Sequence, residues 1–272
     1  MKSTRTVLIT GASSGIGLEL ARCFARDGDA LVLTGRDPAA LAATAEDLRR
    51  AHAVTVTTFA AELGTDAGIT TLLGQIAAAK LEIDVLVNNA GFGVHGNFLT
   101  LDATQELALT TVHLSAPWRL TKALLPAMVA RGRGGVLNIG SIYSFSPAPW
   151  QALYGAAKSW LLSFSLSLRE ELHGTGVNVT ILCPGTTLSR FRTRTGHRDR
   201  PSWFTQTSLE VAVAGHRGFR RGRALVVPGV ASKFYVFGAR VLPTSWLGRY
   251  VYYTAYRLRG MPAPRLSEGK KS

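Results

Sequence analysis

Short apolar runs rich in β-branched residues alternate along the chain with longer segments of helical periodicity. The apolar runs predict seven strands, at 6–10, 30–34, 54–59, 84–88, 135–139, 178–182 and 224–227. Ala- and Leu-rich periodicity between them predicts helices at 15–27, 38–51, 66–79, 103–130 and 152–173. Because the strands are apolar throughout, each should be buried on both faces, as in a parallel sheet covered by helices. We therefore predict a doubly wound α/β fold.

The last part of the chain departs from this alternation. Ser, Thr, Arg, His and Pro dominate 187–223, and strand signals vanish there, so we predict a lid that covers a substrate. Residues 229–272 carry eight aromatic residues between Phe234 and Tyr256, and Pro243 favours two short helices over one long helix. We divide the chain into a catalytic unit, 1–228, and a C-terminal extension, 229–272.

Composition narrows the class of protein. The 272 residues suffice for a buried core, and a hydrophobic content of 46% excludes general disorder. Two cysteines, Cys23 and Cys183, cannot form a disulfide framework, and we expect free core thiols. No run of 18 apolar residues predicts a transmembrane helix, and the N-terminus does not match a signal peptide. We expect a cytoplasmic protein.

The formal net charge of +14 lies entirely in the last third of the chain. Residues 1–189 hold 14 basic and 14 acidic side chains, whereas 190–272 hold 17 basic and three acidic ones. The basic, aromatic extension could dock on the body or on a second subunit, lie on an anionic membrane at the inner face, or steer an anionic substrate. Nucleic acid is disfavoured as the partner because no recognition motif accompanies the charge.

A glycine-rich turn follows the first predicted strand and leads directly into a helix. It reads Thr10-Gly11-Ala12-Ser13-Ser14-Gly15-Ile16-Gly17. Such a junction can bind a pyrophosphate, because glycines let the backbone approach closely and the helix N-terminus offers N–H groups. The spacing matches neither the six-residue dinucleotide fingerprint nor a P-loop, so an ordinary glycine-rich turn is the alternative. A literal Gly-x-Gly-x-x-Gly at 91–96 lacks a following helix, and we interpret it as a loop lining a cleft.

The end of the second strand bears on which cofactor would bind. In dinucleotide folds an acid there holds the ribose 2′-hydroxyl, whereas an Arg accommodates a 2′-phosphate. Gly35 stands where the acid is expected, and Arg36 follows it. The fixed charge of Arg36 suits phosphate, although it could instead pair with Asp37 in solvent. We predict NADP(H) in preference to NAD(H).

A tyrosine and a lysine spaced four residues apart begin the helix at 152–173. Tyr154 and Lys158 share one helix face, and a nearby ammonium should lower the pKa of the phenol from about 10. Ser141 ends the preceding strand and could hold a carbonyl oxygen. A nicotinamide would give hydride to the carbonyl carbon while Tyr154 protonates the oxygen. Taken alone, Tyr-x-x-x-Lys is a common chance match.

Several motifs occur together in one order and spacing: 10–17, Asn88-Asn89-Ala90-Gly91, Ser141, Tyr154-x-x-x-Lys158 and Pro184-Gly185. On these residues the chain resembles a short-chain dehydrogenase/reductase over 5–230. The resemblance implies a Rossmann-type sheet of seven parallel strands, catalysis by Ser141, Tyr154 and Lys158, and a homodimer or homotetramer. It implies cofactor contacts from Gly11, Ser13, Ser14, Gly15, Ile16, Gly17, Arg36, Glu62, Leu63, Asn89, Ala90, Gly91, Tyr154, Lys158, Pro184, Gly185, Thr187 and Ser189.

Two positions depart from the family pattern. His113 stands where the family usually has an Asn that helps a proton relay to the Lys; it could pass protons, or merely fill the space. Glu62 stands where an Asp commonly meets the adenine. The histidines and cysteines show no metal-ligand spacing, so no metal is predicted.

These observations predict an NADP(H)-dependent oxidoreductase that interconverts a carbonyl and a secondary alcohol on a small molecule. Trp203 and Phe204, within the predicted lid, favour a fairly apolar substrate. The alternative is a non-catalytic NADP(H)-binding regulator or a membrane-associated scaffold. Only His113 favours that alternative, and the intact Ser141, Tyr154 and Lys158 argue against it.

Overall fold

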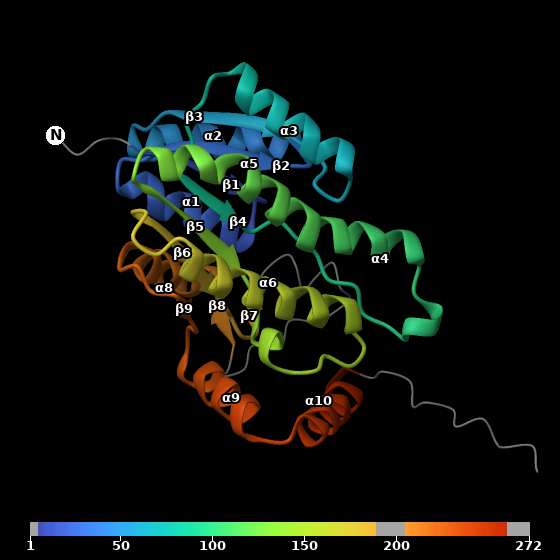
Figure 1. Cartoon of the computed structure of the whole chain (residues 1–272). Helices are drawn as coiled ribbons and strands as arrows, with labels where there is room; N and C mark the ends of the chain where they lie inside the picture. Colours follow the sequence, from blue (N-terminus) through green and yellow to red (C-terminus); the bar gives the residue numbers. More distant parts are fainter. Residues whose placement is uncertain (1–4, 189–204, 260–272) are drawn as a thin grey trace, which may run out of the picture.

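A seven-stranded parallel sheet forms the centre of the molecule (Figure 1). The structure, a computed structural model, describes residues 5–188 and 205–259. The strand order is β3-β2-β1-β4-β5-β6-β9, with every neighbouring pair parallel. The predicted doubly wound fold is therefore confirmed. Its strands are β1 (Thr6–Thr10), β2 (Ala30–Gly35), β3 (Val56–Ala60), β4 (Val85–Asn88), β5 (Gly134–Ile139), β6 (Val177–Leu182) and β9 (Leu225–Val226).

Helices cover both faces of this sheet (Figure 1). Alternate residues of β1 divide between two cores, because successive side chains of a strand point to opposite faces. Val7 and Ile9 pack with α1 (Gly15–Arg26), α2 (Pro38–His52) and α8 (Ser208–Arg220). Leu8 packs instead with α3 (Asp66–Ala78) and α5 (Ala116–Ala130). Helix α6 (Ala152–Glu171) packs against β6 and, with α4 (Ala103–Thr110), borders the site described below.

The long helix predicted at 103–130 is interrupted. A π-helical segment, Thr111–Ser115, separates α4 from α5, and the Ala116 N–H bonds to the Thr111 carbonyl. The physical cause lies in Pro117, which has no N–H to donate to the carbonyl of His113 four residues earlier, as an α-helix would require. The wider π turn accommodates the proline and places His113 on the inner side of the segment, where it is 3% exposed.

The predicted lid at 187–223 is wrong in its second part. Short strands β7 (Thr187–Leu188) and β8 (Gln206–Thr207) pair with each other, and α8 then packs against α1. Val211, Ala212 and Phe219 recur on one helical face and are buried in the first core, so α8 belongs to the covering layer of the sheet. Ser189, Trp203 and Phe204 lie outside the described residues.

The C-terminal extension forms two helices, as Pro243 predicted: α9 (Val230–Val241) and α10 (Thr244–Arg259). Both lie beyond the β9 edge (Figure 1). Helix α9 contacts the short helix η3 (Ile142–Phe145), and α10 contacts Trp150, just before α6. Cys23 and Cys183 are buried free thiols, as expected. Within the described parts of the chain, no helix is both long enough and apolar enough to cross a membrane.

A chain of buried polar side chains connects the centre of the sheet to α6. Asn88 and Asn138 are register partners on β4 and β5, and the Asn88 Nδ2 donates to the Asn138 Oδ1 at 2.8 Å. The Asn138 Nδ2 in turn donates to the Ser165 hydroxyl at 2.8 Å. This hydroxyl donates to the Leu161 carbonyl at 2.6 Å, so the buried polar groups satisfy one another.

Candidate active site

One cleft of about 510 Å³ opens at the carboxyl ends of β1, β4, β5 and β6, where ligands of open α/β sheets bind. The structure gathers nearly every predicted site residue around it. The predicted residues that line it are Gly11, Ser13, Ser14, Gly15, Ile16, Arg36, Glu62, Leu63, Asn89, Ala90, Gly91, His113, Ser141, Tyr154, Lys158, Pro184, Gly185 and Thr187. The loop at 91–96 lines the cleft at Gly91–His95, as interpreted from its sequence.

The glycine turn at one end of the cleft is shaped to approach an anion. Gly11 and Gly15 have φ values of +66° and +59°, a region that favours glycine. Gly17 does not line the cleft but packs against the turn. An added Cβ at Gly17 would lie 2.4 Å from the Gly11 carbonyl oxygen, so only glycine fits there. Among the described residues Ser14, the N-cap of α1, makes no side-chain capping bond, so the first N–H groups of the helix stay available.

Thr10 is a site residue that sequence reasoning missed as such. Its hydroxyl accepts the N–H groups of Asn89 and Ala90, both at 2.9 Å, and donates to the Val87 carbonyl at 3.2 Å. The Asn89 Nδ2 donates back to the Thr10 carbonyl at 2.8 Å. These bonds fix the turn after β1 to the loop after β4. The only available signal was the position of Thr10 directly before Gly11.

Arg36 and Glu62 face each other at the rim of the cleft. The Arg36 Nη1 and the Glu62 Oε2 are 3.6 Å apart, and both side chains are about half exposed. The alternative partner Asp37 is used otherwise, because its carboxylate caps α2 by accepting the Ala40 N–H at 3.1 Å. An exposed pair of this kind contributes little to stability, so a stronger anion can displace Glu62 from Arg36.

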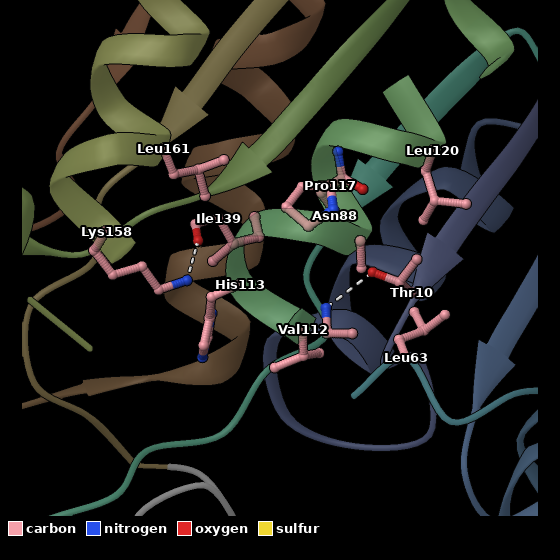
Figure 2. Close-up of a pocket in the computed structure, with 12 residues that line it drawn as sticks. Thr10, Leu63, Asn88, Val112, His113, Pro117, Leu120, Ile139, Lys158 and Leu161 are labelled. Carbon is pink, nitrogen blue, oxygen red and sulfur yellow. Dashed lines mark hydrogen bonds between the residues drawn. The ribbon is translucent and has the colours of Figure 1, made fainter. Parts of the chain in front are cut away.

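Ser141, Tyr154 and Lys158 meet at the other end of the cleft. Ser141 follows β5 and caps η3, accepting the Tyr143 N–H at 3.2 Å. Tyr154 and Lys158 lie in the first two turns of α6. The Lys158 ammonium donates to the Ile139 carbonyl at 2.6 Å and lies 5.6 Å from the centre of the Tyr154 ring (Figure 2 shows Lys158 pointing to Ile139).

Burial dominates the proton affinities of this cluster. It raises the pKa of Tyr154 well above 10, and the hydrogen bond to Ser141 opposes that shift only in part. Burial also lowers the pKa of Lys158 to about 8. The expectation that the ammonium lowers the pKa of Tyr154 is therefore wrong. Desolvation of the phenolate is the larger effect, and Lys158 directs its ammonium to a backbone carbonyl.

His113 packs between the loop after β4 and Tyr154. Its Nε2 lies 2.7 Å from the Phe92 carbonyl oxygen, and its ring meets the Tyr154 ring edge-on at 5.4 Å between centroids. Burial, followed by the Lys158 charge, lowers the pKa of His113 to about 3, so the ring is neutral near pH 7. Its neighbour Gly91 cannot carry a side chain, since an added Cβ would lie 2.2 Å from the His113 ring.

A cavity of about 10 Å³ lies behind the cluster, lined by Thr10, Asn88, His113 and Lys158 among others (Figure 2). That volume is close to the space that one water molecule needs. Within the described residues, no group of three or more His, Cys, Asp or Glu side chains could hold a metal ion.

Curated proteins and solved structures resemble the chain. A ketoacyl reductase, HetN, from a Nostoc strain is 33% identical over 66% of this chain and 63% of its own length. The NADP-dependent 3-hydroxy acid dehydrogenase YdfG from Salmonella typhi is 36% identical over 66% of this chain and 71% of its own. The chain thus matches less than two thirds of the Nostoc protein.

Two solved structures match almost the whole chain. A short-chain dehydrogenase from Sphingobium yanoikuyae in complex with NADPH is 30% identical, with a TM-score of 0.78 over 97% of this chain and 99% of that chain. A bulky-bulky ketone specific alcohol dehydrogenase from Comamonas testosteroni is 28% identical, with a TM-score of 0.74 over 97% of each chain. The family model for short chain dehydrogenase matches residues 5–200. The chain belongs to the short-chain dehydrogenase family.

Proposed function

We propose that this protein is an NADP(H)-dependent oxidoreductase that interconverts a carbonyl and a secondary alcohol on a fairly apolar small molecule. The observation that carries the proposal is that one cleft joins the glycine turn to the cluster of Ser141, Tyr154 and Lys158. NADPH consumption with a panel of aryl and alicyclic ketones, repeated with NADH, tests it. We expect turnover with NADPH, and tight NADPH binding without oxidation by any carbonyl would contradict the proposal.

The residues of the cleft fit a dinucleotide. The turn at Gly11–Gly17 and the N-terminus of α1 would hold the pyrophosphate, and Glu62 and Leu63 would lie by the adenine. Lys158, Asn89–Gly91, Pro184–Gly185 and Thr187 would surround the nicotinamide ribose and ring. Arg36 would meet the 2′-phosphate. The NADPH bound to the Sphingobium structure and the name of the Salmonella protein support the phosphorylated form.

The chain's own residues supply the proton chemistry. When bound, the nicotinamide supplies hydride to the carbonyl carbon. The Ser141 hydroxyl holds the carbonyl oxygen, and Tyr154 transfers its phenolic proton to that oxygen. The raised pKa of Tyr154 keeps the phenol protonated and ready to donate in the reduction direction. The Lys158 ammonium, held by the Ile139 carbonyl at 2.6 Å, would bind the nicotinamide ribose next to Tyr154.

The role of His113 stays a prediction. The neutral His113 ring can take up a proton at one nitrogen and release one from the other only if the contact between its Nε2 and the Phe92 carbonyl breaks. The same contact holds the loop after β4 in place beside Tyr154. We infer that His113 positions this loop and Tyr154, with the small cavity beside Lys158 offering room for one water molecule in a relay.

The C-terminal helices expose apolar side chains on one face each, which we name the α9–α10 face. The side chains recur at helical spacing and are 59 to 72% exposed: Val230, Phe234, Phe237 and Val241 on α9, and Trp246, Tyr250 and Tyr253 on α10. The charged residues at 229–254 are Lys233, Arg240 and Arg249, and the sequence has no acid between Glu210 and Glu268.

We propose that the α9–α10 face lies on an anionic membrane surface. Aromatic and aliphatic side chains interleaved with basic ones suit the headgroup region of anionic lipid. A second copy of the chain is the less favoured occupant, because a two-fold contact would set this positive face against itself. The homodimer or homotetramer that the family resemblance implies would then form through other surfaces.

Vesicle binding by the full-length protein checks the membrane proposal. We expect binding to phosphatidylglycerol vesicles that weakens with salt, with little binding to phosphatidylcholine. The double variant Phe234→Ser/Phe237→Ser should bind at least about tenfold more weakly, because burying one such side chain contributes about 1.5–3 kcal/mol. The matched control Leu209→Ser removes a half-exposed side chain from α8 and should bind normally.

Two outcomes would overturn this assignment. One is equal binding of the double variant and the control to the anionic vesicles. The other is an oligomer in sedimentation velocity that the double variant alone loses, which would assign the α9–α10 face to a second copy of the chain.

A further inference from the structure

A second cavity lies beside the reaction centre, and we name it the side pocket. It measures about 260 Å³ and lies between the 94–101 loop, α4, the start of α6 and α10. Val94, Gln151 and Tyr154 line both the side pocket and the main cleft. A molecule whose carbonyl reached Tyr154 would therefore meet the opening of the side pocket directly.

The walls of the side pocket are mostly apolar. They comprise Val94, Phe98, Leu101, Leu109, Pro149, Trp150, Leu153 and Tyr252. An engineered apolar cavity of about 150 Å³ holds benzene, so this larger volume has room for more than one six-membered ring. The side pocket thus suits an aromatic or alicyclic group.

Helix α10 supplies one wall of the side pocket. Its Leu247 and Val251 are buried, which anchors the helix to the body, and its Tyr252 stacks on Trp150 with ring centroids 5.7 Å apart and planes at 23°. Trp150 has a φ of +67°, in the left-handed region that bulky residues avoid. Its carbonyl accepts the Gly96 N–H at 3.0 Å, which helps to hold this strained backbone.

One charged group interrupts the apolar lining of the side pocket. The Trp150 Nε1 and Tyr252 Oη are buried without a hydrogen-bond partner within residues 5–188 and 205–259, so these two side chains present their ring carbons to the pocket. Glu106 is the one charged residue in the lining, and its carboxylate forms no ion pair with the described residues. An ionised carboxylate only accepts hydrogen bonds, so a hydroxyl group on a bound molecule is a suitable partner for Glu106.

We propose that the side pocket binds the larger substituent of the substrate, a ring system that carries a hydroxyl group. A hydroxyl can donate to the Glu106 carboxylate, which an unsubstituted ring cannot do. The inference rests on the proposed function, because it places the reacting carbonyl at Tyr154. It assigns α10 a role in substrate selection, with Trp150 and Tyr252 as the residues that determine specificity.

Paired substrates and variants test the proposal in the full-length protein. We compare butan-2-one, 2-acetylnaphthalene and its 6-hydroxy derivative, with kcat and KM measured separately. Tyr252→Ala should lower the kcat/KM ratio of the naphthyl ketone to butan-2-one by about 10- to 100-fold, chiefly through KM. Leu107→Ala removes an exposed side chain from α4, outside the lining of the side pocket, and should keep that ratio within about twofold. Glu106→Leu, which has no acceptor, should remove most of the preference for the hydroxylated ketone.

Direct binding of 2-naphthol, which has no carbonyl to reduce, separates this proposal from the proposed reaction. We expect 2-naphthol to quench protein fluorescence, with an affinity that falls at least about tenfold in Tyr252→Ala and stays normal in Leu107→Ala. If no ketone is turned over but 2-naphthol binding depends on Tyr252, the reaction assignment fails and the side pocket stands. Equal binding by both variants, or an unchanged ketone ratio in Tyr252→Ala, would overturn the side pocket.

Discussion

Replacing Tyr154 with phenylalanine is expected to lower kcat for carbonyl reduction by about 10²- to 10⁴-fold, the usual contribution of a positioned general acid. The substitution removes only the hydroxyl, because the ring keeps its edge-on packing against His113. NADPH binding should change little, since the glycine turn and Arg36 lie at the other end of the cleft. Single-turnover NADPH oxidation, with NADPH affinity measured separately by fluorescence, checks both expectations.

Tyr143→Phe is the matched control for this experiment. Tyr143 lines the same cleft, and we assign it no proton transfer. Its variant should lose far less turnover than Tyr154→Phe, and thermal melting should show that both variants are folded. A comparable loss in the two variants, or full turnover in Tyr154→Phe, would contradict the proposed role of Tyr154.

Replacing Arg36 with serine should raise the KM for NADPH by about 10- to 100-fold and leave the KM for NADH within about threefold. A hydrogen bond to a charged group contributes about 1.5–3 kcal/mol, and only NADPH has the 2′-phosphate to receive it. The loss of the contact to Glu62 adds little, because both side chains are about half exposed. Steady-state kinetics with each cofactor measures the change in preference directly.

Arg50→Ser is the control for the charge alone. Arg50 lies on the exposed surface of α2, 73% exposed and outside the cleft, so the variant loses the same charge without the proposed contact. It should retain the preference for NADPH. An unchanged KM for NADPH in Arg36→Ser, or an equal rise for NADH, would show that Arg36 does not read the 2′-phosphate.

Much of the fold followed from local pattern. The apolar runs located the sheet strands to within about two residues, because a strand buried on both faces must be apolar throughout. The glycine turn could also be predicted from the sequence, because few residues other than glycine adopt the φ values of Gly11 and Gly15. The motifs around Ser141, Tyr154 and Lys158 are local too, and the parallel topology brings them to one edge of the sheet.

Other features depend on tertiary contacts that no local pattern encodes. The pKa of Tyr154 rises because surrounding segments bury it, whereas the sequence showed only the lysine four residues on. The stacking of Trp150 on Tyr252 joins residues far apart in the chain. The break at 111–115 had a visible cause in Pro117, but helical periodicity masked it. Helix α8 was hidden in a polar, arginine-rich stretch, although Val211 and Phe219 share its buried face.

The hydrogen-bonded chain of Asn88, Asn138 and Ser165 guards against misalignment of the site. If β4 shifted against β5 by one residue, amide groups of Asn88 and Asn138 would lose their hydrogen-bond partners in the apolar interior. Each unsatisfied group would lower the free energy of unfolding by about 1–3 kcal/mol. Ser141 follows Asn138 by three residues, and Tyr154 precedes Ser165 by three turns of α6. These hydrogen bonds thus fix the positions of Ser141 and Tyr154 relative to each other. A substitution that breaks one of them is expected to lower the turnover rate before it causes unfolding.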